Sequence, residues 1–261
     1  MKNRPIGVFD SGMGGITILS RLMEVLPHED YIYYGDSIHN PYGEKSEQEI
    51  LTYAMFVSEF LIDKGCKAIV IACNTASSVA VDYLREKFPE TLFIATVPAL
   101  KMAMDEDRKQ NVLVMATKAT LASKKFRDLY NSYKEEQSHI HLLNCNNLAN
   151  LIEEEVQTKI NQKLKKLLAY YEKQNINTVV LGCTHYPLIK DNIKALLGNV
   201  KMIEGSYGIS GELKKRLKDR DLLNTKRTKG ILMIYNSLGE KYVNKTKEIL
   251  RIYQNKNKKE N

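Results

Sequence analysis

The sequence lacks several features that would place it in a familiar class of protein. It has no apolar run of about 18 residues or more, so we expect no membrane-spanning helix. Residues 1–10 lack the charged, then apolar, then small-residue layout of a signal peptide, which predicts a cytoplasmic protein. There are only four cysteines and no C-x-x-C pair, so we expect free thiols rather than disulfides.

Signatures of nucleotide and nucleic-acid binding are absent as well. Neither G-x-G-x-x-G nor G-x-x-x-x-G-K-[ST] occurs. The net charge is +8, with much of the excess in residues 214–218 and in the tail after Tyr253, which we expect to be frayed. No aromatic-and-basic recognition motif accompanies this charge, so nucleic-acid binding is not expected as a main function. A basic field would instead attract a dianionic small molecule.

Short apolar segments alternate with helical patterns along most of the chain. Such alternation predicts parallel sheets that are covered by helices on both faces. Ser46 and Glu49 form a capping box before one of the helices. The expected strands are residues 6–9, 31–34, 68–72, 92–96, 112–116, 140–143, 178–181, 200–203 and 231–235, and the last expected helix is residues 242–253.

A weak internal repeat divides the chain into two similar halves. The segment A-I-V-I-A-C-N-T at residues 68–75 resembles T-V-V-L-G-C-T-H at residues 178–185, and residues 6–11 resemble residues 113–117 at nearly the same offset. We therefore predict an α/β protein of two similar doubly wound parallel-sheet domains, with the active site in the cleft between them. The first domain is expected to cover residues 1–97, completed by 206–261, and the second residues 98–205.

Three polar peptides follow expected strands, where ligands bind in open parallel sheets. In Asp10-Ser-Gly-Met-Gly-Gly15 the glycines would let the backbone approach a ligand, and the N-terminus of the next helix favours an anion. A tight structural turn is the other interpretation of these glycines. The other two peptides are Cys73-Asn-Thr75 and Cys183-Thr-His-Tyr-Pro187.

Cys73 and Cys183 occupy equivalent positions in the two halves. Each could be a small buried hydrophobe, but each is followed by hydroxyl or amide residues that can bind a carboxylate. Two thiols on opposite sides of a cleft suit the inversion of a carbon centre, because one thiolate can remove a proton while the other thiol donates one. Asp10 and His185 are candidates for moving protons on and off the sulfurs, or else a helix cap and a structural histidine.

Cys66 and Cys145 lack such neighbours, and we expect both to be structural.

Taken in order, these motifs resemble the signature blocks of the glutamate racemase family, from Ile6 to about Ile203. The opening block is G-V-F-D-S-G-M-G-G at residues 7–15. The other matching segments are Y-G-D at 34–36, P-Y-G at 41–43, A-C-N-T at 72–75, Ala116 and Thr117 with Thr120 and Ser123, and G-C-T-H-Y-P at 182–187.

The resemblance implies a cofactor-independent and metal-free isomerase that interconverts L- and D-glutamate and supplies D-glutamate for peptidoglycan synthesis, and hence for cell wall biogenesis and cell shape. It implies a homodimer, with Cys183 acting on L-glutamate and Cys73 on D-glutamate. Glu153 stands where the family has a helper carboxylate, with Glu154 and Glu155 competing for that place. The implied substrate contacts are Asp10, Ser11, Tyr42, Gly43, Asn74, Thr75, Thr117, Thr184 and His185.

Three segments depart from the family pattern. Residues 37–40 replace a stretch that usually contains arginine, residues 204–206 replace an Asp-Ser-like pair, and the chain matches poorly from Leu222 onward. Other functions also fit the residues. These are a racemase of another acidic amino acid such as aspartate, a hydrolase with Cys183 as nucleophile and His185 as base, and a non-catalytic amino-acid or metal binder. A zinc site could use Cys73, Cys183 and His185, but closely spaced ligand pairs are absent.

Overall fold

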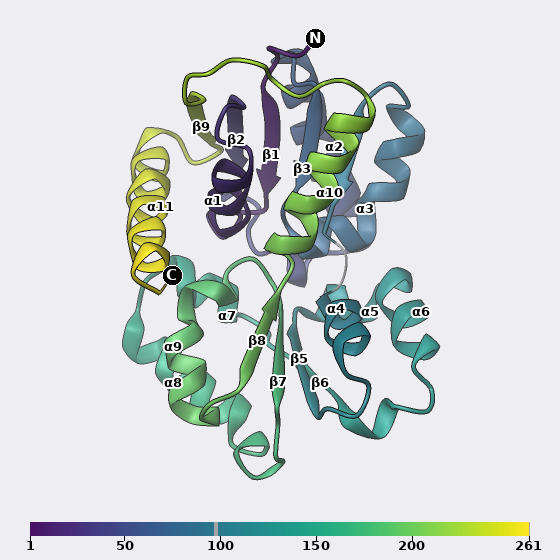
Figure 1. Cartoon of the computed structure of the whole chain (residues 1–261). Helices are drawn as coiled ribbons and strands as arrows, with labels where there is room; N and C mark the ends of the chain where they lie inside the picture. Colours follow the sequence, from purple (N-terminus) through teal and green to yellow (C-terminus); the bar gives the residue numbers. More distant parts are fainter. Residues whose placement is uncertain (97–98, 261) are drawn as a thin grey trace.

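Two parallel β-sheets form the framework of the protein in a computed structural model, which describes residues 1–96 and 99–260 (Figure 1). The first sheet has the strand order β4-β3-β1-β2-β9 and the second has the order β6-β5-β7-β8. All neighbouring strands run parallel, which confirms the predicted fold class. The strands are β1 (Ile6–Asp10), β2 (Tyr31–Gly35), β3 (Ala68–Ile71), β4 (Leu92–Ala95), β5 (Val112–Ala116), β6 (Ile140–Asn144), β7 (Thr178–Gly182), β8 (Lys201–Glu204) and β9 (Leu232–Asn236).

Helices cover both faces of the first sheet because its strands bury side chains alternately on each side. Ile6 and Val8 of β1 pack with α1 (Ile16–Val25), α10 (Ser206–Asp219) and α11 (Glu240–Glu260). Phe9 packs on the opposite face with α2 (Glu47–Asp63) and α3 (Asn74–Lys87). The capping box at the start of α2 is confirmed, since Ser46 and Glu49 bond to each other's backbone N–H.

The second sheet is covered in the same way. One face packs against α4 (Ala99–Glu106) and α6 (Lys124–Ser132), and the other against α7 (Leu148–Glu153), α8 (Gln157–Leu168) and α9 (Lys190–Leu197). The short helix α5 (Lys118–Ala122) contacts α3 of the first half. Four 3₁₀ turns complete the described elements: η1 (Tyr42–Glu44), η2 (Gln137–His139), η3 (Tyr171–Lys173) and η4 (Tyr186–Ile189).

The C-terminal segment lies against the first sheet, where β9 pairs with β2 and α11 packs beside α1 (Figure 1). The expectation of a frayed tail after Tyr253 is wrong, because α11 continues to Glu260. Lys256 holds this last part of the helix against the second half, with its Nζ 2.5 Å from Oδ2 of Asp191. The expected domain boundary between residues 97 and 98 lies outside the described residues.

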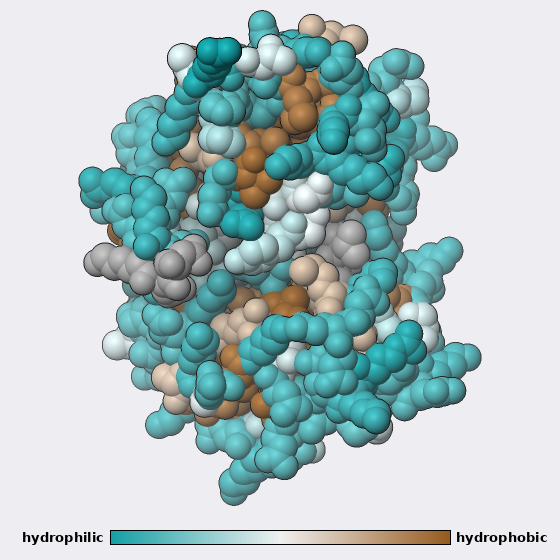
Figure 2. All heavy atoms as spheres, in the orientation of Figure 1, coloured by the Kyte–Doolittle hydropathy of each residue, from teal (hydrophilic) through white to brown (hydrophobic). Residues whose placement is uncertain are grey.

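Hydrophilic residues make up most of the face shown in Figure 2, and apolar residues show mainly where elements pack together. Among the described helices, none combines the length and the apolar character that crossing a lipid bilayer requires.

Candidate active site

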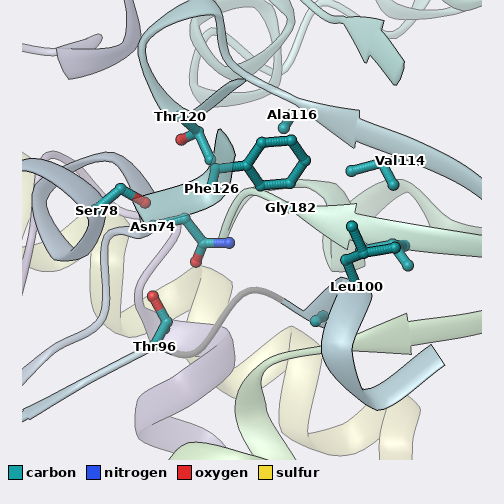
Figure 3. A pocket seen from close by; sticks show the side chains of 11 residues that line it. Asn74, Ser78, Thr96, Leu100, Val114, Ala116, Thr120, Phe126 and Gly182 are labelled. Carbon is teal, nitrogen blue, oxygen red and sulfur yellow. The ribbon is translucent and has the colours of Figure 1, made fainter. Parts of the chain in front are cut away.

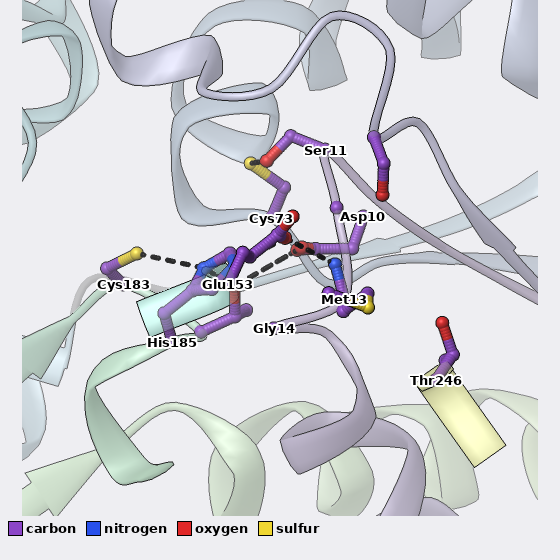
Figure 4. A network of polar contacts seen from close by, with 12 residues as sticks. Asp10, Ser11, Met13, Gly14, Cys73, Glu153, Cys183, His185 and Thr246 are labelled. Carbon is purple, nitrogen blue, oxygen red and sulfur yellow. Dashed lines mark hydrogen bonds and ion pairs between the residues drawn. The ribbon is translucent and has the colours of Figure 1, made fainter. Parts of the chain in front are cut away.

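The loops at the carboxyl ends of the two sheets contact each other. Thr184, after β7, donates a hydrogen bond from its hydroxyl to Oδ1 of Asp10 at the end of β1, over 3.0 Å. Beside it, the hydroxyl oxygens of Thr75 and Thr117 lie 2.9 Å apart. These contacts bring the three polar peptides singled out in the sequence into one buried region between the halves (Figure 4).

Cys73 is the sulfur of the first half. It follows β3 and caps α3, with its Sγ accepting a hydrogen bond from the backbone N–H of Ala76 and donating to Oγ of Ser11, both over 3.4 Å. Only 5% of the residue is exposed. Burial and the negative charge of Asp10 raise the pKa of the Cys73 thiol to about 12. At neutral pH this sulfur therefore carries its proton.

Cys183 is the sulfur of the second half, and its surroundings differ in charge. Its Sγ lies 3.6 Å from Nδ1 of His185, whose Nε2 lies 2.8 Å from Oε1 of Glu153. Burial alone would lower the pKa of His185, but its hydrogen bonds with Cys183 and Glu153, and their negative charges, raise that pKa well above the usual value. A protonated His185 donates from both ring nitrogens, so it stabilises a negative charge on Cys183.

The glycine loop after β1 is where side chains of the second half approach the first. A Cβ atom on Gly12 would overlap the Glu153 carboxylate, and one on Gly14 would overlap the His185 ring. The backbone N–H of Met13 donates to Oε1 of Glu153 over 2.6 Å. The sequence predicted that these glycines admit a ligand and an anion, whereas the anion placed there is the chain's own Glu153. Among the three consecutive glutamates, Glu153 is the one in contact with His185.

The remaining predicted site residues lie around these loops. The hydroxyl of Tyr42 donates to Oδ2 of Asp36 over 2.7 Å, and a Cβ on Gly43 would overlap Thr117. Asn74 lines a cavity of about 10 Å³ with Thr96, Thr120 and other residues of both halves (Figure 3). That volume is close to the least that can hold one water molecule, so this cavity cannot hold an amino acid.

Asp10 does not cap the following helix, since Gly15 occupies the N-cap position of α1 and no side chain bonds there. Asp10 is instead fully buried against Thr184. Burial raises the pKa of its carboxyl, while the charge of His185 and the Thr184 hydrogen bond act in the opposite direction. Its position therefore suits a group that exchanges protons with its neighbours.

The other two cysteines show that a raised pKa does not by itself mark a site. Burial raises the thiol pKa of Cys66 and of Cys145 to about 12, as it does at Cys73. Cys66 packs in the apolar cluster beneath α2. Cys145 packs in the same apolar cluster as Cys183, whose negative charge also acts to raise the pKa of Cys145.

Sequence reasoning missed two polar residues that organise these loops. Thr17 donates from its hydroxyl to the backbone oxygens of Gly14 and Thr184, over 3.0 Å each, and so joins the halves. The residues near Thr17 in the sequence cannot predict this contact, because its partner Thr184 is 167 residues away. Asp36 belongs to the Y-G-D segment named above, but its role was missed: it positions Tyr42, and its place directly after β2 could have indicated this.

Within residues 1–96 and 99–260, no three side chains of His, Cys, Asp or Glu are grouped so that they could hold a metal ion. Cys73, Cys183 and His185, which were considered for zinc, therefore form no such group.

The fold, with equivalent cysteine loops at facing sheet edges, is that of two-domain α/β racemases, which are isomerases. The family model for Asp/Glu/Hydantoin racemase matches residues 17–206. A glutamate racemase of Clostridium perfringens (strain 13 / Type A) is 46% identical over 250 residues, covering 93% of this chain and 94% of the relative. The chain therefore belongs to the Asp/Glu/hydantoin racemase family, and within it to the glutamate racemases.

Solved structures agree with this assignment. Glutamate racemase from Francisella tularensis, in complex with D-glutamate, has a TM-score of 0.79 and 34% identity, covering 96% of this chain and 94% of that one. Escherichia coli glutamate racemase, in complex with L-glutamate and the activator UDP-MurNAc-ala, has a TM-score of 0.81 and 27% identity, covering 96% and 95%.

Proposed function

We propose that this protein interconverts L- and D-glutamate by a two-cysteine, two-base mechanism that needs no cofactor. One observation carries the proposal, namely the opposite charge around the two sulfurs. Burial and the charge of Asp10 raise the pKa of the Cys73 thiol, whereas Sγ of Cys183 lies 3.6 Å from Nδ1 of His185, which is a cationic donor when the ring is protonated. An acid and a base are thus supported on the two sides of one region before any substrate binds.

In the direction from L-glutamate, the Cys183 thiolate removes the proton from the α-carbon. The electron pair left on the carbon is then protonated on the opposite face by the Cys73 thiol, which gives D-glutamate. Afterwards Cys183 carries a proton and Cys73 is a thiolate, which is the state required for D-glutamate. Asp10 and His185 exchange protons with these sulfurs to restore the first state.

Substrate contacts are proposed for the residues around the two sulfurs. Hydroxyl, amide and backbone N–H groups from both halves can bind the two carboxylates of glutamate. Because Cys73 and Cys183 are only 5% and 8% exposed, the halves must separate for glutamate to reach them. The proposed contacts are Asp10, Ser11, Tyr42, Gly43, Asn74, Thr75, Thr117, Thr184 and His185.

Membership of the family supports a proposed cellular setting. We place the protein in the cytoplasm as a homodimer that supplies D-glutamate for peptidoglycan synthesis. The net charge of +8 would attract glutamate, whose two carboxylates and one ammonium leave it a net anion at neutral pH.

The direct test is loss of optical activity. Protein treated with a chelator and dialysed is expected to racemise L-glutamate, and D-glutamate at the same kcat/KM, because enantiomers have equal free energies. Circular dichroism follows the reaction without added cofactor. L-Aspartate in a parallel cuvette tests the alternative acidic substrate. A flat signal with L-glutamate at high protein concentration would refute the proposed function.

The Glu153 carboxylate is expected to set the alkaline limit of activity. Glu153→Gln removes the negative charge beside His185, so the pKa of His185 falls and the ring loses its proton at lower pH. The alkaline limb of kcat/KM should therefore move to lower pH, with activity at its optimum reduced on the order of tenfold. The measurement is the pH profile of kcat/KM.

Glu154→Gln is the matched control, because this neighbouring side chain bonds only to Asn150 at the surface among the described contacts. Glu154→Gln should have the same pH profile of kcat/KM as the parent. An unmoved alkaline limb in Glu153→Gln would contradict the helper role of this carboxylate.

A further inference from the structure

A lysine on the last helix contacts the turn that carries Glu153. Nζ of Lys245, in α11, donates to the backbone oxygen of Glu153 over 2.5 Å and lies 2.9 Å from Oε2 of Glu155. Since α11 packs on the first sheet and α7 on the second, this contact joins the two halves of the molecule.

The carbonyl at Glu153 needs such a partner. Glu153 is the last residue of α7, a helix of six residues, and the final carbonyls of a helix have no partner within it. An ammonium group satisfies the carbonyl and is also favoured by the negative end of the helix dipole. The backbone leaves the helix at once through Glu155, whose φ is +58°. The chain is therefore not helical directly after Glu153, and the next helix, α8, begins only at Gln157.

Lys245 can hold this turn firmly because its own segment is anchored. The next residue, Thr246, is fully buried, and its hydroxyl donates to the backbone oxygen of Tyr242 over 2.7 Å. Leu250 and Tyr253, one and two turns further along α11, lie in the core of the first sheet. Figure 4 shows Thr246 on the α11 segment drawn beside the polar network.

Glu153 is consequently held at both ends. Lys245 binds its main chain, while its carboxylate accepts from the Met13 N–H and contacts His185. We propose that Lys245 is a positioning residue for the racemisation proposed above. By fixing the end of α7, it keeps the Glu153 carboxylate on His185 and so maintains the charge that supports Cys183 as a base. This inference rests on the proposed function.

The charged groups around His185 act on its pKa, so the test must distinguish their effect from that of Lys245. They are Cys183 on its own loop, Glu153 from α7 and Asp10 from β1. Lys245 acts on none of these charges directly in this proposal, but on the position of one of them. A merely structural lysine would affect unfolding and leave the titration of His185 unchanged.

The experiment compares Lys245→Met with Lys256→Met in the full-length chain. Both changes remove an ammonium with which α11 contacts the second half, but Lys256 contacts exposed Asp191, away from Glu153. Lys245→Met is expected to lower kcat/KM roughly tenfold, mainly through kcat, and to move the alkaline limb to lower pH. Lys256→Met should have the same kcat/KM and the same alkaline limb as the parent. Lys245→Arg, which keeps a cationic donor, should recover most of the activity.

A double variant tests whether the two residues act together. If Lys245 acts through Glu153, adding Lys245→Met to Glu153→Gln should reduce kcat/KM by less than twofold further, because the effects are not additive. A full additional tenfold loss would overturn the proposal. So would a Lys245→Met variant with an unmoved pH profile, or one matched by Lys256→Met.

A measurement without substrate separates this inference from the proposed function. NMR titration of the His185 ring should give a lower pKa in Lys245→Met than in the parent and in Lys256→Met. Absence of racemisation in the parent would refute the proposed function, whereas a lowered His185 pKa in Lys245→Met would still show that Lys245 positions Glu153. An unchanged His185 titration in Lys245→Met would refute the positioning role even if the parent racemises glutamate.

Discussion

Cys73→Ala and Cys183→Ala are each expected to lower kcat/KM on the order of 10²–10⁴-fold, in both directions of the reaction. Each sulfur serves one face of the α-carbon, so neither can replace the other. The loss must be equal for the two enantiomers, because their equal free energies require the same kcat/KM in any variant. Circular dichroism with L- and with D-glutamate gives both values.

Cys66→Ala and Cys145→Ala are the matched controls, since both thiols are also buried and have a pKa raised to about 12. They are expected to retain most of the activity. Cys145 is the more demanding control, because the charge of Cys183 contributes to the pKa of its thiol. Thermal unfolding of all four variants would separate loss of chemistry from loss of fold. Near-normal turnover by either Cys73→Ala or Cys183→Ala would rule out a two-base site.

The second large effect is isotopic. In deuterium oxide, nearly all D-glutamate formed from L-glutamate should carry deuterium at the α-carbon from the first turnovers. The proton taken by Cys183 cannot be the one returned by Cys73, whose sulfur carries deuterium from the solvent. Unreacted L-glutamate should stay largely protonated while conversion is low, provided that the intermediate is seldom returned to its starting face. Mass spectrometry of the separated enantiomers measures both.

A single-base enzyme would give a different result. Its one group would hold the proton of the substrate and could deliver it to the opposite face, so part of the product would be unlabelled. Substantial protonated D-glutamate at low conversion would therefore refute the assignment of separate roles to Cys73 and Cys183. The reverse experiment from D-glutamate is the internal control, and it should label L-glutamate in the same way.

The positions of the strands could be predicted because most of their side chains are buried. The inner strands of the two sheets are buried along their whole length, so each appears in the sequence as a short, largely apolar run; they are β1, β2, β3, β5 and β7. Val112–Ala116 was predicted to the residue, and each of the other strands agrees within one residue at either end. The extent of α11 was not predictable in this way. Its last part is charged, and it is held by an ion pair of Lys256 with the distant Asp191.

The candidate site was predictable only in part. The repeat and the family motifs indicated Cys73 and Cys183, because each follows an apolar strand at an equivalent position. The sequence indicated the glycines of the loop after β1, but it did not indicate which side chains lie against them. Gly12 and Gly14 are needed because side chains from a different half of the molecule occupy the adjacent space.

The sequence by itself therefore indicated the strands, the two similar halves and the two cysteine loops, since each can be recognised from short segments of consecutive residues. Only the tertiary structure decided which of three consecutive glutamates contacts His185. Local pattern cannot distinguish them, whereas the Met13 N–H that donates a hydrogen bond to the Glu153 carboxylate is 140 residues away. The same holds for Lys245, one of several lysines on α11, which is distinguished only by the carbonyl of Glu153 that it contacts across the two halves.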